Sequence, residues 1–157
     1  MIKIKDRVLH GIVTGIISGT PDTLLNLLQY RIGITDIKYS NMGASLFFPK
    51  DLIHNRLAQI TGMVANFILI GTAGVMYTFL LSLTGRDKAL VKGIGFGFSL
   101  WVFVLGIGNK MGLIDKIKNP LSPLLSLIDH VIFGTLLGLI APSLADQSMF
   151  PKKHKPS

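Results

Sequence analysis

The chain has 157 residues, enough for one domain of ordinary size, and it combines 49% hydrophobic residues with only 15% charged ones. It has no cysteine, which excludes disulfides and thiolate metal sites. Its net charge of +8 is carried mainly at the ends of apolar segments, without interleaved aromatic residues, which argues against nucleic-acid binding and for a lipid bilayer as the partner.

The first apolar segment covers about residues 8–28. The basic residues before it are typical of a signal peptide, but the segment is long and lacks a small-residue cleavage site, so we predict a retained helix. Pro21 interrupts this helix because it cannot donate to the helical ladder and crowds the preceding turn. Two interpretations stay open: a kink near Pro21, or a broken helix in which Thr20 caps a second half-helix.

A long connection, residues 30–59, follows. Its apolar stretch at 42–48 is too short to cross a bilayer, so we predict an interfacial or re-entrant element there. A helical pattern resumes near Asp51, which predicts that the second helix projects beyond the membrane.

Three more apolar segments cover about residues 60–83, 89–107 and 121–144. Each is long enough to span a bilayer at 1.5 Å rise per residue. The short polar turn at 84–88 makes the second and third segments antiparallel neighbours. The sequence therefore predicts a single all-α domain over 1–157, a bundle of about four transmembrane helices, with a basic tail at 149–157.

Orientation follows from the basic residues. If both termini lie on one side of the membrane, that side holds nine lysines and arginines and the other side holds seven. The positive-inside rule then places both termini in the cytoplasm.

Small residues recur at four-residue spacing on three of the predicted helices, which lets helix backbones approach closely. The predicted packing positions are Gly11, Gly15, Gly19, Gly93, Gly97, Gly134 and Gly138. Packing within one chain is the favoured interpretation, and dimerisation is the alternative.

Five polar residues fall inside the apolar segments, where lipid makes them costly: Asp22, Asn26, Asn66, Asp129 and His130. A functional interpretation makes Asp22, Asp129 and His130 a proton or cation relay. The structural alternative is that Asp22 caps a half-helix, Asp129 reaches the interface and His130 bonds a neighbouring backbone group or serine.

No catalytic motif, dinucleotide fingerprint or phosphate loop is present, and the four histidines show no metal-ligand spacing. We therefore predict no enzymatic activity, no cofactor and no metal.

The glycine-ridged first helix and three runs, 83–90 (LTGRDKAL), 92–97 (KGIGFG) and 130–134 (HVIFG), resemble small uncharacterised four-helix membrane proteins of bacteria, notably Firmicutes. The resemblance extends over most of the chain and implies a protein of the bacterial cytoplasmic membrane. It implies no activity, cofactor or catalytic residue.

Two functions are compatible with these features. The first is a non-enzymatic membrane protein that acts by helix packing with itself as a homo-oligomer, with lipid or with another membrane protein. The alternative is an oligomeric small transporter or channel subunit that passes protons or cations along the intramembrane polar residues.

Overall fold

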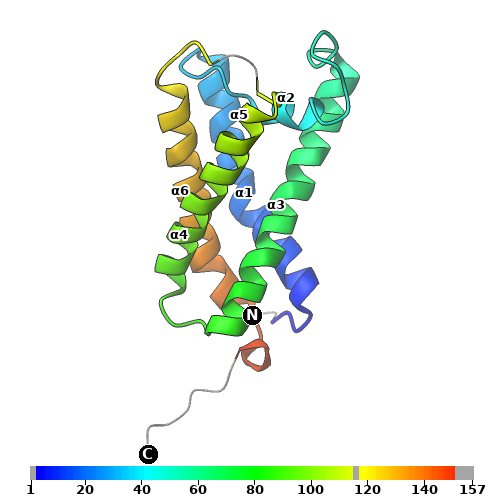
Figure 1. The fold of residues 1–157 in the computed structure, drawn as a ribbon. Helices are drawn as coiled ribbons and strands as arrows, with labels where there is room; N and C mark the ends of the chain where they lie inside the picture. The colour runs from blue at the N-terminus through cyan, green and yellow to red at the C-terminus, as the bar shows by residue number, and fades with distance from the viewer. Residues whose placement is uncertain (1–2, 115–116, 151–157) are drawn as a thin grey trace, which may run out of the picture.

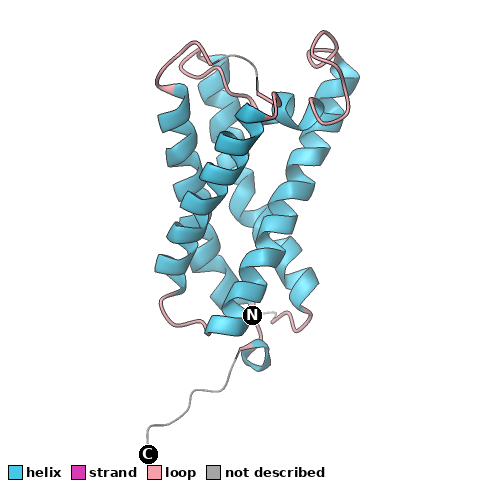
Figure 2. Ribbon diagram, viewed as in Figure 1, coloured by secondary structure: helices cyan, strands magenta, loops and turns pink. Residues whose placement is uncertain are grey.

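The computed structural model describes residues 3–114 and 117–150. Within these ranges the protein is helical without a β-strand, as Figure 2 shows, so the predicted all-α class is confirmed. The helices are α1 (Arg7–Arg31), α2 (Tyr39–Ala44), α3 (Arg56–Thr84), α4 (Ala89–Trp101), α5 (Gly108–Lys110) and α6 (Ser122–Leu144). A π-helical segment, Val102–Ile107, joins α4 to α5, and a 3-10 turn, Gln147–Met149, follows α6.

The long helices run side by side along one axis (Figure 1). α1 packs against α3 and α6, and α4 packs against α6. The turn between α3 and α4 holds Gly85 and Lys88 at positive φ, 78° and 55°, and this reversal makes the predicted antiparallel hairpin. The Lys92 ammonium donates to the carbonyls of Thr84 and Gly85, at 3.0 and 2.8 Å, and so satisfies the C-terminal end of α3.

Three helical segments are long and apolar enough to cross a membrane: α3, the continuous helical run Ala89–Lys110, and α6. α1 is not among them, because polar residues lower its mean hydropathy. Those polar residues are buried inside the bundle, whereas apolar side chains such as Leu9, Leu24 and Leu28 are 54 to 61% exposed. The fourth span stays a prediction.

α1 is one uninterrupted helix from Arg7 to Arg31, with Pro21 in its interior. The broken-helix alternative is therefore wrong, while the kink stays a prediction. Breaking the helix would leave further backbone groups without partners, whereas α3 and α6 pack along its length and support it. The Thr20 hydroxyl, expected to cap a half-helix, instead donates to the Ile16 carbonyl at 2.7 Å.

The connection between α1 and α3 folds back onto the bundle. α2 lies within it and packs on α3, with Gly43 against Gly62 so closely that neither position has room for a Cβ atom. The helical pattern expected near Asp51 begins later, at Arg56, where the Asn55 side chain accepts from the Leu57 amide at 3.1 Å and caps α3. The depth of residues 42–48 relative to a bilayer stays a prediction.

Both described ends of the chain lie at the same end of the bundle (Figure 1). The Ile4 amide donates to the Leu144 carbonyl at 2.9 Å, and the Asp146 amide donates to the Ile4 carbonyl at 3.0 Å. The N-terminal segment is thereby tied to the end of α6. Most of the predicted basic tail, residues 151–157, lies outside the described residues.

Candidate functional site

The predicted packing glycines lie at two helix contacts inside the chain. Gly11 and Gly15 of α1 meet Gly74 of α3, where an added Cβ would come within 2.7 Å of the Gly15 backbone. Gly19 of α1 lies against the Ile70 side chain of α3. Gly11, Gly15 and Gly74 require glycine because the two backbones touch there, whereas Gly19 makes room for a side chain.

The second contact joins α4 to α6. A Cβ atom added at Gly93 would come within 2.9 Å of the Gly138 backbone, and Gly97 and Gly134 face each other next to it. Every predicted packing glycine is therefore used within one chain, which leaves none of these ridges free for a second copy.

Asp129 lies in the bundle interior and is completely buried. Its carboxylate accepts a hydrogen bond from the Gln29 amide at 2.8 Å and one from the Tyr39 hydroxyl at 3.3 Å. The expectation that Asp129 reaches the interface is wrong, because α1 and α2 supply these two donors inside the bundle. Burial, reinforced by the Asp22 and Asp129 carboxyls, raises the pKa of Tyr39 well above its usual range, so this hydroxyl stays a donor.

Asn26 holds the segment that carries Tyr39. Its side-chain amide donates to the Ile37 carbonyl and its side-chain oxygen accepts from the Tyr39 backbone amide, both at 3.0 Å. One asparagine thus satisfies two backbone groups of a loop packed into the bundle. Asn26 has a positioning role, since it sets where the Tyr39 hydroxyl meets Asp129.

Asp22 lies near Asp129 and is only 6% exposed, yet its Oδ1 atom has no hydrogen-bond partner within the described residues. It does not cap a half-helix, because α1 continues through it. Nearly all buried polar atoms in proteins are hydrogen-bonded, so this carboxyl is an exception that calls for an explanation.

His130 and Asn66 complete the polar group. His130 bonds the Ser126 carbonyl through Nδ1 at 2.8 Å, as the structural interpretation predicted, and stacks edge-on against the Tyr39 ring at 6.0 Å between centroids. The Asn66 amide donates to the Thr23 hydroxyl at 3.0 Å and so joins α3 to α1.

A cavity of about 380 Å³ lies between α3 and the helical run Ala89–Lys110. Among the described residues, its polar lining consists of Asp22, Tyr39, Asn66, Thr72 and His130. Asn26 and Asp129 lie behind this wall, where both bond to Tyr39. The volume is in the range of small-molecule sites. The structure therefore brings three of the five predicted polar residues to one cavity and places the other two in its supporting network.

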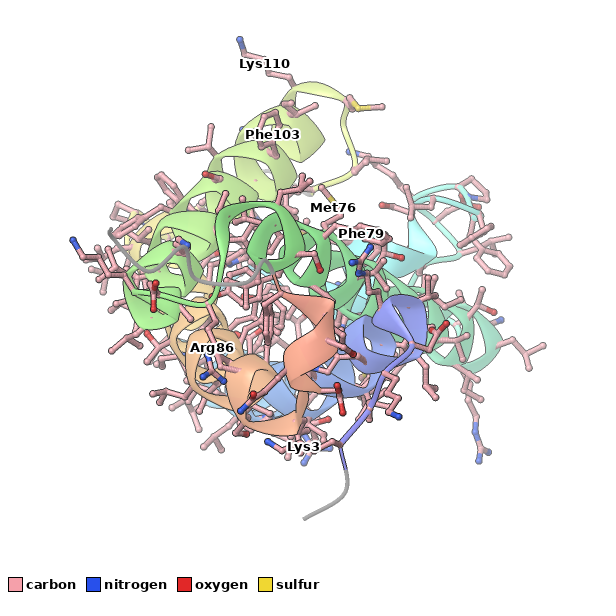
Figure 3. All side chains as sticks on the ribbon, turned by 90° about the horizontal axis from the view of Figure 1, so that it is seen from below. Lys3, Met76, Phe79, Arg86, Phe103 and Lys110 are labelled. Atoms are coloured by element: carbon pink, nitrogen blue, oxygen red, sulfur yellow. The ribbon has the colours of Figure 1, made fainter. Side chains whose placement is uncertain are left out.

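The rest of the cavity wall is apolar and includes side chains on the outer surface of the bundle. These exposed lining residues are Leu46, Leu69, Met76, Phe103, Val104, Ile107 and Met111. Figure 3 shows Met76 and Phe103 on the same side of the bundle, on the two helical segments that flank the cavity. The cavity is thus rimmed by the kind of surface that faces lipid in a membrane protein.

The model of the DUF6789 family, a family of unknown function, matches residues 5–152. The chain belongs to the DUF6789 family. The match confirms that the chain belongs to a family of unknown function, as the resemblance of its sequence runs implied. Comparison with curated proteins and with solved structures gives no match.

The match spans every described helix of this DUF6789 protein, and with them the polar group and the cavity. Within the described residues, no group of three or more histidines and acidic residues has the arrangement of a metal site.

A polar stripe runs along α1 beside the glycine ridge of the DUF6789 protein. His10, Thr14, Ser18, Asp22 and Asn26 are four residues apart and all are buried. They extend over about 24 Å of helix at 1.5 Å per residue. Only the last two were predicted. The signal for the others is their regular spacing, each directly before one of the glycines that bring α1 close to α3.

His10 connects three helices at the end of this stripe. Its Nδ1 atom lies 2.9 Å from the Thr78 hydroxyl of α3, and its Nε2 atom lies 2.9 Å from the Ala141 carbonyl of α6. Because a carbonyl only accepts, a neutral ring with its proton on Nε2 satisfies both contacts when Thr78 donates to Nδ1.

Proposed function

We propose that this DUF6789 protein is a non-enzymatic, multi-pass protein of the bacterial cytoplasmic membrane with four spans. α1 supports the count of four, because its polar stripe faces inward while its outward surface is leucine, isoleucine and valine. Polar residues on the inner face and apolar residues on the outer face suit a helix that contacts other helices on one side and lipid on the other. The resemblance of its sequence runs to bacterial membrane proteins supports the bacterial origin.

We further propose that both termini lie in the cytoplasm. The excess of basic residues at that end comes from Lys152, Lys153 and Lys155, which lie outside the described residues. The orientation therefore depends on a tail that anionic lipids of the cytoplasmic leaflet attract.

Single-cysteine labelling tests this orientation, since the chain has no cysteine of its own. Ser148 is exposed at the end that holds the termini, and His54 is exposed at the opposite end. We expect a membrane-impermeant maleimide to label His54→Cys in intact cells and Ser148→Cys only after the membrane is permeabilised. The reverse pattern would overturn the orientation, and labelling of both in intact cells would contradict the four-span topology.

The function that the geometry supports best is the binding of a lipid-soluble small molecule in the cavity between α3 and Ala89–Lys110. One observation carries this proposal: the cavity has exposed apolar side chains at its rim and a buried, incompletely hydrogen-bonded carboxyl at its base. Such a site admits a molecule from the surrounding lipid and offers one end of it a polar contact.

Action by association through glycine ridges has less support, because those ridges are covered within the chain. Proton or cation passage would use the same polar residues. The apolar character of most of the cavity wall favours a bound molecule with an apolar body over a hydrated ion.

Binding can be measured through Trp101, the single tryptophan of the chain. Trp101 packs in the same cluster as Tyr39 and Met42, and both of these residues line the cavity. We expect 11-bromoundecanol to quench Trp101 saturably in lipid nanodiscs and undecanol to reverse the quenching by competition.

The matched variants are Thr72→Phe and Thr84→Phe. Both threonines are exposed on α3, but only Thr72 lines the cavity. We expect Thr72→Phe to weaken saturable quenching about tenfold by occupying the cavity mouth, and Thr84→Phe to leave it unchanged. Quenching that rises in proportion to the bromoalcohol without saturation would show that the probe only dissolves in the bilayer, and the proposed function would be wrong.

A further inference from the structure

We infer that the molecule bound in this cavity is an amphiphilic amine, with its ammonium head held by the Asp22 carboxylate and its apolar tail along the α3 wall. This inference rests on the proposed function and specifies the chemical class of its ligand.

The polar base of the cavity is acidic. Asp22 lines it directly and Asp129 lies close behind, near enough for the two carboxyls to interact. Among the described residues that line the cavity, none is a lysine or an arginine. A buried carboxylate is stable only when a counter-charge or several hydrogen bonds compensate for the loss of water, and a ligand can supply that charge.

The two carboxyls are not equivalent. Asp129 already accepts hydrogen bonds from Gln29 and Tyr39, so its role is to add negative potential and to hold Tyr39. Asp22 is more than nine-tenths buried, and its Oδ1 atom is unpartnered in the described part of the chain. Because Asp22 lines the cavity, a head group there with N–H donors and a positive charge compensates the buried carboxylate by a charge-assisted hydrogen bond.

An acidic head group is disfavoured by the same geometry. A fatty-acid carboxylate would place a third acidic group beside Asp22 and Asp129 in a region of low dielectric, where like charges repel strongly. A neutral alcohol would hydrogen-bond to Asp22 without neutralising it. The expected order of affinity is amine, then alcohol, then acid.

The apolar walls of the cavity indicate where the tail of the amine lies. Leu69 and Met76 line the cavity from α3, and Phe103 and Ile107 line it from the run Ala89–Lys110. All four are exposed on the surface expected to meet lipid. An alkyl chain between them has apolar contacts on both sides, and it enters from the bilayer without crossing water.

The test compares three probes with the same brominated tail: 11-bromoundecylamine, 11-bromoundecanol and 11-bromoundecanoate. Saturable quenching of Trp101 is measured in zwitterionic nanodiscs at neutral pH. Dissociation constants are expressed as mole fractions in the bilayer, after correction for partition into empty nanodiscs. We expect the amine to bind about tenfold to a hundredfold more tightly than the alcohol, and the acid to bind most weakly.

Asp22→Asn should remove the preference for the amine and keep alcohol binding. Asp51→Asn is the matched control, because Asp51 is an exposed acid of the loop before α3 and its loss removes the same charge from the surface. A wild-type protein that binds amine and alcohol equally would overturn the inference, and this comparison needs no variant to fold. A preference that survives in Asp22→Asn would overturn the role of Asp22. Failure of all three probes to saturate would instead refute the proposed function itself.

Discussion

Gly93→Leu is expected to prevent the protein from reaching its native packing, whereas Gly95→Leu, two residues away on α4, should be tolerated. A Cβ atom at Gly93 would meet the Gly134 carbonyl and the Gly138 backbone, and α6 has no flexible side chain there that can move aside. A Cβ atom at Gly95 meets nothing within 4 Å and points away from the bundle. Overpacking alone costs about 1 to 3 kcal/mol, and forcing two helix backbones apart costs more.

The measurement is the midpoint of thermal unfolding in a mild detergent, together with the monodisperse fraction after size-exclusion chromatography. We expect a large loss in both for Gly93→Leu and values near wild type for Gly95→Leu. Equal losses in the two variants would indicate that a longer side chain on α4 is harmful for reasons unrelated to the contact with α6.

His10→Ala is expected to produce the second largest effect. The substitution removes the hydrogen bonds to Thr78 and Ala141 and leaves space at the junction of α1, α3 and α6. The Ala141 carbonyl keeps its hydrogen bond from the Ala145 amide, at 3.2 Å, whereas the buried Thr78 hydroxyl loses its ring partner. Losing a large buried side chain together with such a hydrogen bond destabilises by about 2 to 5 kcal/mol. His54→Ala, in an exposed loop, should change the unfolding midpoint very little.

His10→Gln separates hydrogen bonding from volume, because an amide side chain offers both a donor and an acceptor. Partial recovery of the unfolding midpoint in His10→Gln relative to His10→Ala would support the three-helix link. A His10→Ala protein as stable as His54→Ala would contradict it.

Much of the architecture could be predicted from local patterns. The apolar segments at 60–83, 89–107 and 121–144 correspond to α3, to Ala89–Lys110 and to α6, because the length of an apolar run is a property of consecutive residues. The hairpin at 84–88 follows from a turn too short to allow anything but antiparallel neighbours. α1 was harder to define, since Pro21 is compatible with a kink, a break or, in a well-packed bundle, a continuous helix.

The candidate site could not be predicted from local patterns, because it is formed by contacts between residues that are far apart in the sequence. Gln29 and Asp129 are a hundred residues apart, and their hydrogen bond exists only because α1 and α6 lie side by side. Tyr39 was not among the predicted site residues, because its place is set by Asn26 holding the loop that carries it. His10 looked isolated in the sequence, since its partners Thr78 and Ala141 belong to other helices.

The sequence by itself determined the helical class, three membrane-compatible segments, the hairpin and the small-residue ridges, because each depends on neighbours within a turn or two of the chain. Only the tertiary structure decided which ridges meet, that Asp22 and His130 share a cavity with Asn66, and that Asp129 lies behind it. The reason is physical: the direction in which a helix presents each side chain depends on its rotation about its own axis. Close glycine contacts between whole helices set that rotation, and no single segment contains the information.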